Sequence, residues 1–179
     1  MSKDIELVKK LQNPTLKDST FSELLDVYQE RLYWHIRKIV ATHENADDVL
    51  QNTFIRIYKS ILKFEGKSSL HTWMYRIAYN ESIRFLEKNN KKRYDNIDEV
   101  SESNLEVLFQ DEYFDGGEIQ KKLHRIIASF KEKQKRVFTM KYFDDLSFRQ
   151  ISEILDVSES TLKSTYYTCV KIIEQKILM

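Results

Sequence analysis

The sequence has little of what disulfide, metal or membrane chemistry needs: one cysteine, one proline and three glycines in 179 residues. The lone Cys169 has no partner for an internal disulfide and no metal-ligating neighbour at a suitable spacing, and the four histidines are scattered. We therefore expect no metal site and no cofactor, and we expect Cys169 to be a small buried hydrophobe. No run of about 18 apolar residues is present, and the first six residues lack the apolar core of a signal peptide. These absences predict a cytoplasmic protein without direct membrane insertion.

Apolar residues recur at spacings of three and four, whereas alternating runs and turn residues are few. This pattern predicts an all-α protein. Thr20 with Glu23 fits a capping box, and Asn45 and Ser69 are candidate caps of two further helices. The helices expected in the first half run from Thr20 to near Thr42, from Asn45 onward, and from Ser69 to Lys88.

The overall charge of +1 hides an uneven distribution. Residues 1–93 carry 17 Lys or Arg against 12 acids, residues 94–118 carry none against 9, and residues 119–179 carry 12 against 7. Two basic segments joined by an acidic one predict two small helical domains, residues 1–93 and 118–179, with an acidic linker over 94–117. We also hypothesise that the uncompensated acids shield the basic halves in the free protein.

The second half predicts a helix-turn-helix. Helices are expected over about 118–130 and 133–143; Ser147 and Gln150 then fit a capping box that opens a short helix to Leu155. Residues 156–158 form a turn, with Asp156 where a left-handed backbone is expected, and Ser158 caps a helix to about residue 178.

In such a motif the second helix enters the major groove of DNA. Its inner stripe would be Leu162, Tyr166, Cys169 and Ile173, which leaves a hydroxyl-rich outer face with little charge. The expected DNA-binding residues of this motif are Ser160, Thr161, Lys163, Ser164, Thr165 and Tyr167, with Arg149 and Lys171 as phosphate contacts. A helical hairpin with no DNA role is the alternative.

Residues 64–93 combine a glycine-bearing loop, aromatic side chains and a basic tail. Unpaired bases offer faces for stacking while cations hold the backbone, so this combination suits opened DNA better than closed duplex. The candidates are the loop residues Phe64, Gly66, Lys67, Ser68 and Ser69, then Trp73, and a row at every fourth helical position: Thr72, Arg76, Asn80, Arg84 and Lys88. A packed tryptophan and a solvated face would look similar.

Two blocks of the first half, residues 47–55 and 64–80, resemble region two of extracytoplasmic-function sigma factors. Residues 146–155, continuing through 161–164, resemble region four of the same family. The similarity covers about residues 18–93 and 118–177, in the family's order and spacing.

The resemblance implies a dissociable subunit of bacterial RNA polymerase, not an enzyme, that reads two promoter elements at once. Residues on the outer face of the second helix would dock on the coiled coil of the β′ subunit: Asp48, Gln51, Asn52 and Arg56. Residues 64–70 would capture a flipped base, and the row from Thr72 to Lys88 would line the minus-ten element. The helix from Ser158 would read the minus-thirty-five element, with its domain on the β-subunit flap. An anti-sigma factor is a further expected partner.

The chain departs from the family pattern on the last helix and before it. Thr165, Thr168 and Val170 stand where arginines are frequent, Asn52 where an acid is frequent, and residues 131–133 replace a Leu-Pro opening. Reading of the upstream element is therefore expected to be weaker or differently specified. Two other classes stay open from the residues alone: a stand-alone helix-turn-helix regulator, and a helical interaction protein.

Overall fold

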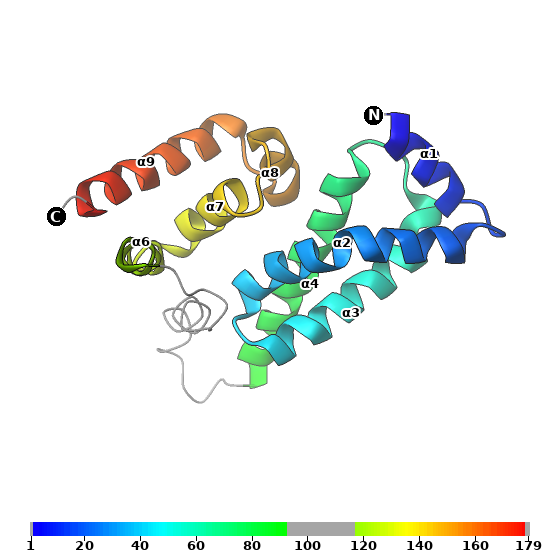
Figure 1. Cartoon of the computed structure of the whole chain (residues 1–179), viewed down its shortest axis with the longest axis horizontal. Helices are drawn as coiled ribbons and strands as arrows, with labels where there is room; N and C mark the ends of the chain where they lie inside the picture. The colour runs from blue at the N-terminus through cyan, green and yellow to red at the C-terminus, as the bar shows by residue number, and fades with distance from the viewer. Residues whose placement is uncertain (1, 93–116, 178–179) are drawn as a thin grey trace.

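A computed structural model describes residues 2–92 and 117–177, and every regular element in these ranges is a helix (Figure 1). The N-terminal half holds α1 (Ser2–Leu11), α2 (Lys17–Val40), α3 (His43–Ser60), the short 3-10 helix η1 (Ile61–Lys63) and α4 (Leu70–Lys92). The C-terminal half holds α6 (Glu118–Ala128), α7 (Glu132–Tyr142), α8 (Phe148–Leu155) and α9 (Glu159–Ile177). The all-α prediction is confirmed, and the predicted linker lies outside the described residues except for Gly117.

Several predicted helix starts are confirmed by their caps. Ser69 Oγ accepts a hydrogen bond from the backbone N–H of Thr72 at 3.1 Å. Ser147 and Gln150 form the predicted reciprocal box, with bonds of 3.2 and 2.9 Å. Asp156 adopts the left-handed conformation, with φ 55° and ψ 45°, so the chain turns sharply between α8 and α9.

Two predicted starts are wrong. Thr20 lies buried inside α2, which begins at Lys17, because the turn before it leads directly into the helix: Lys17 N–H donates to the carbonyl of Asn13 at 2.9 Å. Asn45 lies within the first turn of α3. Its backbone N–H donates to Oγ1 of Thr42, the extended residue that caps this helix.

The sequence reading assigned no helix before Thr20, yet α1 covers the end of the N-terminal half (Figure 1). Leu11 is fully buried. The side chain of Gln12, just after α1, donates to the carbonyls of Ile61 and Phe64 at 3.2 and 3.0 Å. These bonds attach α1 to the loop that precedes α4.

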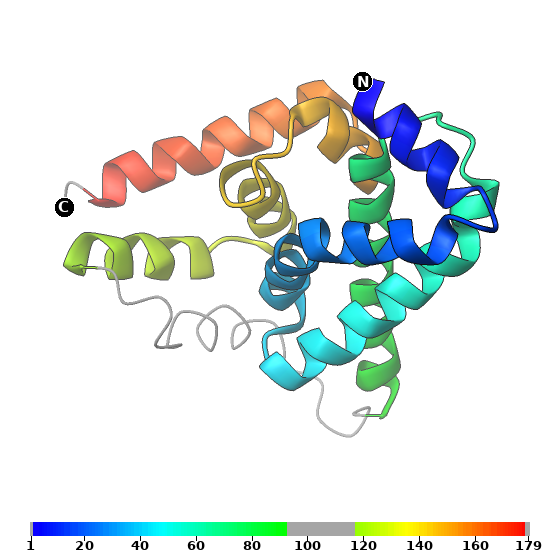
Figure 2. The same ribbon diagram turned by 45° about the vertical axis from the view of Figure 1, so that its right-hand side comes forward.

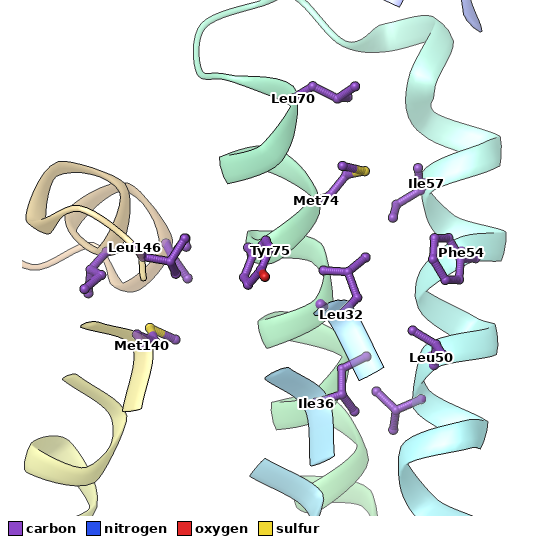
Figure 3. Close-up of a cluster of buried hydrophobic side chains, with 14 of the residues drawn as sticks. Leu32, Ile36, Leu50, Phe54, Ile57, Leu70, Met74, Tyr75, Met140 and Leu146 are labelled. Carbon is purple, nitrogen blue, oxygen red and sulfur yellow. The ribbon is translucent and has the colours of Figure 1, made fainter. Parts of the chain in front are cut away.

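The core of the N-terminal half lies between α2, α3 and α4, whose apolar stripes face one another (Figure 3). Full burial of a leucine, isoleucine, phenylalanine or methionine side chain stabilises a fold by about 1.5–3 kcal/mol relative to its exposure to water. The core includes Leu32, Ile36, Leu50, Phe54, Ile57, Leu70 and Met74. This three-helix scaffold fixes the directions in which the outer faces of α3 and α4 point.

The two halves pack against each other: one cluster of buried side chains extends from the N-terminal half to residues of α7, α8 and α9, and a second cluster lies within the C-terminal half. α8 lies on α4, as both ribbon views agree (Figures 1 and 2). Tyr75 projects from α4 toward Met140 and Leu146 of the other half (Figure 3). Arg136 Nη1 also donates to the hydroxyl of Tyr79 across this interface, at 3.0 Å.

A buried ion cluster lies at the same interface. One carboxylate oxygen of Asp144 is 2.7 Å from Nδ1 of His35 and the other binds Nζ of Lys38; the three side chains are 3%, 2% and 9% exposed. Burial alone would raise the pKa of Asp144, but the charges of His35 and Lys38 outweigh it and hold that pKa below its ordinary value. The scattered histidines of the sequence gave no sign of this cluster, because His35 and Asp144 are 109 positions apart.

Candidate nucleic-acid interface

The loop between η1 and α4 presents residues 64–69 of the predicted base-capturing segment at or near the surface, whereas Leu70, at the start of α4, is 1% exposed. Gly66 has a φ of 72°, and a Cβ built on it would meet no atom within 4 Å. Glycine is therefore needed here for its backbone conformation and not for space. The rings of Phe64 and Trp73 lie 5.0 Å apart and pack against the core, and both side chains remain partly exposed beside the loop.

This loop borders a cavity of about 710 Å³. α1 forms one wall, and the start of α8 forms another through Arg149, Gln150 and Glu153. The loop and the start of α4 contribute Phe64, Glu65, Gly66, Lys67, Ser68, Ser69, Leu70 and Thr72. Residues predicted to read two different promoter elements thus line a single cavity in this arrangement.

The row along α4 is mostly open to solvent. Arg76, Asn80, Arg84 and Lys88 are exposed on one side of the helix. Thr72 differs: it is 2% exposed, and its hydroxyl lies 2.8 Å from that of Ser69. Its observed contacts belong to the start of α4, and its role at DNA stays a prediction.

The outer face of α3 carries the four residues predicted to bind polymerase, and all four are exposed: Asp48, Gln51, Asn52 and Arg56. Ile55, which the sequence reading did not name, lies among them and is 46% exposed. Glu81 of α4 accepts from Arg56 Nε at 2.6 Å and from Arg84 Nη1 at 2.5 Å. One carboxylate therefore joins the outer face of α3 to the row on α4.

The C-terminal half contains the predicted helix-turn-helix. Leu162 and Cys169 of α9 are 1% and 0% exposed and face inward, as expected. Burial raises the pKa of the Cys169 thiol to about 11, so this cysteine stays protonated and unreactive near neutral pH. The ring of Phe148 at the start of α8 lies 5.7 Å from that of Tyr166, which fixes α8 against α9.

The outer face of α9 is short of hydrogen-bond donors. Most of the α9 residues predicted to bind DNA are exposed, and Thr165 is half-buried. The hydroxyls of Thr165 and Thr168 donate to backbone carbonyls of their own helix at 2.9 and 2.8 Å, so toward a ligand they act as acceptors. Lys163 lies 3.6 Å from Glu159, and Arg149 lies 3.4 Å from Glu153.

The described ranges lack two features that other kinds of site need. Residues 2–92 and 117–177 contain no cluster of three His, Cys, Asp or Glu side chains that could hold a metal ion. Within the same ranges, no helix combines the length and apolar character needed to span a bilayer.

Comparisons with known proteins give both halves a family. Residues 24–92 match the family model for Sigma-70 region 2, and residues 120–167 match that for Sigma-70, region 4. The ECF RNA polymerase sigma-E factor of Haemophilus influenzae is 31% identical, over 97% of this chain and 95% of its own. The ECF RNA polymerase sigma factor SigW of Bacillus subtilis is 27% identical, over 80% of this chain and 81% of its own.

Solved structures share the fold. The sigma factor RpoE from Bartonella quintana, crystallised with the anti-sigma factor NepR, superposes with a TM-score of 0.68 at 18% identity and covers 88% of this chain and 96% of its own. CnrH, in a complex with the cytosolic domain of CnrY, superposes with a TM-score of 0.67 at 14% identity and covers 96% of this chain and 95% of its own. Family models on both halves and a relative that matches almost end to end lead to one conclusion: the chain belongs to the sigma-70 family and is an RNA polymerase sigma factor of the extracytoplasmic-function type.

Proposed function

We propose that residues 1–93 bind core polymerase and open the minus-ten element, that residues 118–179 grip the minus-thirty-five duplex, and that residues 94–117 join them. The observation that carries this proposal is the Gly66 loop with its aromatic pair, set directly before an exposed row of Arg76, Asn80 and Arg84. A loop for an unpaired base and cations for its backbone are the parts that strand opening needs.

The energetics of opening fit two modest contacts acting together. Extruding one base costs a few kcal/mol, which stacking and hydrogen bonds in a pocket can offset once polymerase holds the DNA nearby. Tethering raises the local concentration of each half for its own element, so neither half needs to bind DNA tightly alone. The protein would act as a non-catalytic subunit, in the cytoplasm where polymerase works.

Docking on polymerase would use the outer face of α3. Asp48, Gln51 and Asn52 offer polar groups there, with Arg56 at one side and the exposed Ile55 in their midst. An apolar side chain surrounded by polar ones is the usual build of a protein interface. The partner would be the coiled coil of the β′ subunit, while the C-terminal half would rest on the β flap.

The packed arrangement of the two halves in the free chain would be a closed form that cannot read both promoter elements. Promoter elements at minus ten and minus thirty-five are about 25 base pairs apart, roughly 85 Å along B-DNA at about 3.4 Å per base pair. Here Gly66 and Arg149 line the same cavity. Reading both elements at once would therefore require the halves to separate, with loss of the contacts around Asp144 and Tyr75.

An anti-sigma factor is the second partner that we propose. The sigma factor RpoE of similar fold was crystallised with the anti-sigma factor NepR. A partner that favours the closed arrangement would keep the surfaces of α4 and α8 together and so keep the protein from promoter DNA.

Run-off transcription with core polymerase on genomic fragments tests the proposed function. Discrete transcripts that depend on both the chain and core polymerase would support it, since core polymerase alone lacks promoter choice. A stand-alone regulator would instead bind closed duplex without polymerase and yield no such transcripts. Failure to associate with core polymerase, where a known sigma subunit associates, would contradict the proposal.

A further inference from the structure

A groove of about 430 Å³ lies between the start of α7 and α9. Its lining includes three residues of α9, the second helix of the helix-turn-helix, which we call the recognition helix: Ser164, Thr165 and Thr168. The facing wall is residues 131–134, which include residues 131–133, the stretch that stands in place of the family's Leu-Pro opening. The departure from the family pattern therefore lies beside the helix that would read DNA.

This wall presents positive charge. Glu132 is its one acid, and its carboxylate lies 3.3 Å from Nζ of Lys135, a side chain only 9% exposed. Glu132 is itself 51% exposed, so the wall turns one acid and two lysines, Lys131 and Lys133, to solvent, and its net charge there is positive. We call these two residues the α7 lysine pair.

The α7 lysine pair and Arg149 flank the recognition helix on different sides. Lys163 Nζ lies 5.9 Å from the ring centre of Phe148, so the start of α8 is on the Lys163 side of α9. Thr165, which lines the groove, is two residues further along, or about 200° around a helix of 3.6 residues per turn. A helix in the major groove, about 12 Å wide, has a sugar-phosphate strand on each side.

The recognition helix cannot supply these phosphate contacts alone. The hydroxyl hydrogens of Thr165 and Thr168 already bind backbone carbonyls, and phosphate oxygens accept hydrogen bonds but do not donate them. Lys163 shares its charge with Glu159, as Arg149 does with Glu153, and the exposed Lys171 is the other cation of α9 predicted to contact phosphate. Cations beside the helix would therefore add to the affinity for duplex.

We propose that the α7 lysine pair binds the phosphates of one strand of the upstream duplex, while Arg149 binds those of the other. This inference rests on the proposed function, because it assigns a DNA-facing role to residues beside α9. The contacts hold the duplex in register against a hydroxyl-rich recognition helix. They do not distinguish one base sequence from another.

The test uses holoenzyme assembled from the full chain and core polymerase, with the double variant Lys131→Ala/Lys133→Ala. Affinity for a promoter duplex is measured over a series of KCl concentrations. The logarithm of the association constant falls linearly with the logarithm of the salt concentration, and each lost phosphate contact makes this fall less steep by about 0.9. The slope of the double variant should therefore be less steep than that of the wild type by about 1.8. Binding should weaken by the same factor on matched and mismatched upstream elements.

Two further variants separate a lost contact from a lost fold or a general charge effect. Lys131→Arg/Lys133→Arg should keep the wild-type slope, because charge and donors are retained. Lys176→Ala, at the far end of α9, should leave the slope nearly unchanged. An unchanged slope in the alanine pair, or loss of binding to core polymerase by that variant, would overturn the inference. Absence of promoter binding by wild-type holoenzyme would instead contradict the proposed function itself.

Discussion

Replacement of Asp144 by asparagine should separate the two halves of the free protein. Asp144 is the acceptor at the buried interface for both His35 and Lys38, and its side chain is 3% exposed. Asparagine keeps the size of the side chain but removes its charge. Lys38 is then left in the interface without an anion, and His35 loses its charged acceptor.

The size of the effect follows from this burial. Removal of one partner from a buried ion pair costs about 3–5 kcal/mol. At 1.36 kcal/mol per factor of ten, the closed-to-open equilibrium should shift toward open by roughly two to four powers of ten. Opening relieves the cost because water can then reach His35 and Lys38.

Energy transfer between two dyes reports the opening. Lys59→Cys on α3 and Lys176→Cys on α9 place one dye on each half, at exposed positions. Cys169 should not compete for the dye, because its side chain is fully buried and its pKa is raised to about 11. Transfer should fall in the Asp144→Asn variant while helical circular dichroism is retained.

The neighbouring acid supplies the matched control. Asp145 is exposed and has a φ of 52°, a conformation that asparagine also tolerates, so Asp145→Asn should leave the transfer at the wild-type value. Unchanged transfer in Asp144→Asn would refute the reasoning. So would a loss of helical structure equal in both halves, because the ion cluster would then support folding and not closure.

Three further outcomes are expected. Asn80→Ala should slow open-complex formation by holoenzyme, followed by permanganate reactivity of unpaired thymines, without loss of binding to core polymerase; unaltered opening would remove Asn80 from the site. Gly66→Ala should destabilise the loop by about 1–2 kcal/mol, because alanine is strained at the positive φ of this position, and should slow open-complex formation in the same assay. Lys67→Ala, its control, should leave the loop conformation intact. The pKa of Asp144 is lowered in the closed state, so its stabilisation of that state is complete above the ordinary carboxyl pKa and is lost as pH falls through the lowered pKa. Dye transfer should therefore fall only in strong acid. Opening of the halves between pH 5 and 7 would contradict this.

Local signals were sufficient to predict the helix-turn-helix. The Ser147 and Gln150 box, the left-handed Asp156 and the cap at Ser158 depend on residues within four positions of one another, and all three are present. The Ser69 cap is predictable for the same reason. Such features could be read from sequence because short-range hydrogen bonds decide them.

Tertiary contacts decided what the sequence did not predict. The ion cluster joins His35 to Asp144, and the Arg136 bond to Tyr79 spans 57 positions, so no local pattern marks either. Whether Thr42 or Asn45 caps α3 depended on which residue the preceding turn leaves extended. The base-capturing loop could be predicted, but the cavity that it shares with α8 could not, because that cavity exists only when the halves meet.

The separation of the halves in the working complex tests the central claim most directly. The same pair of dyes, on α3 and α9, is followed as core polymerase and then a promoter duplex are added to the wild-type chain. The account predicts that transfer drops to near zero, because the two elements lie roughly 85 Å apart at about 3.4 Å per base pair. A transcriptionally active promoter complex that keeps the transfer of the free protein would contradict it.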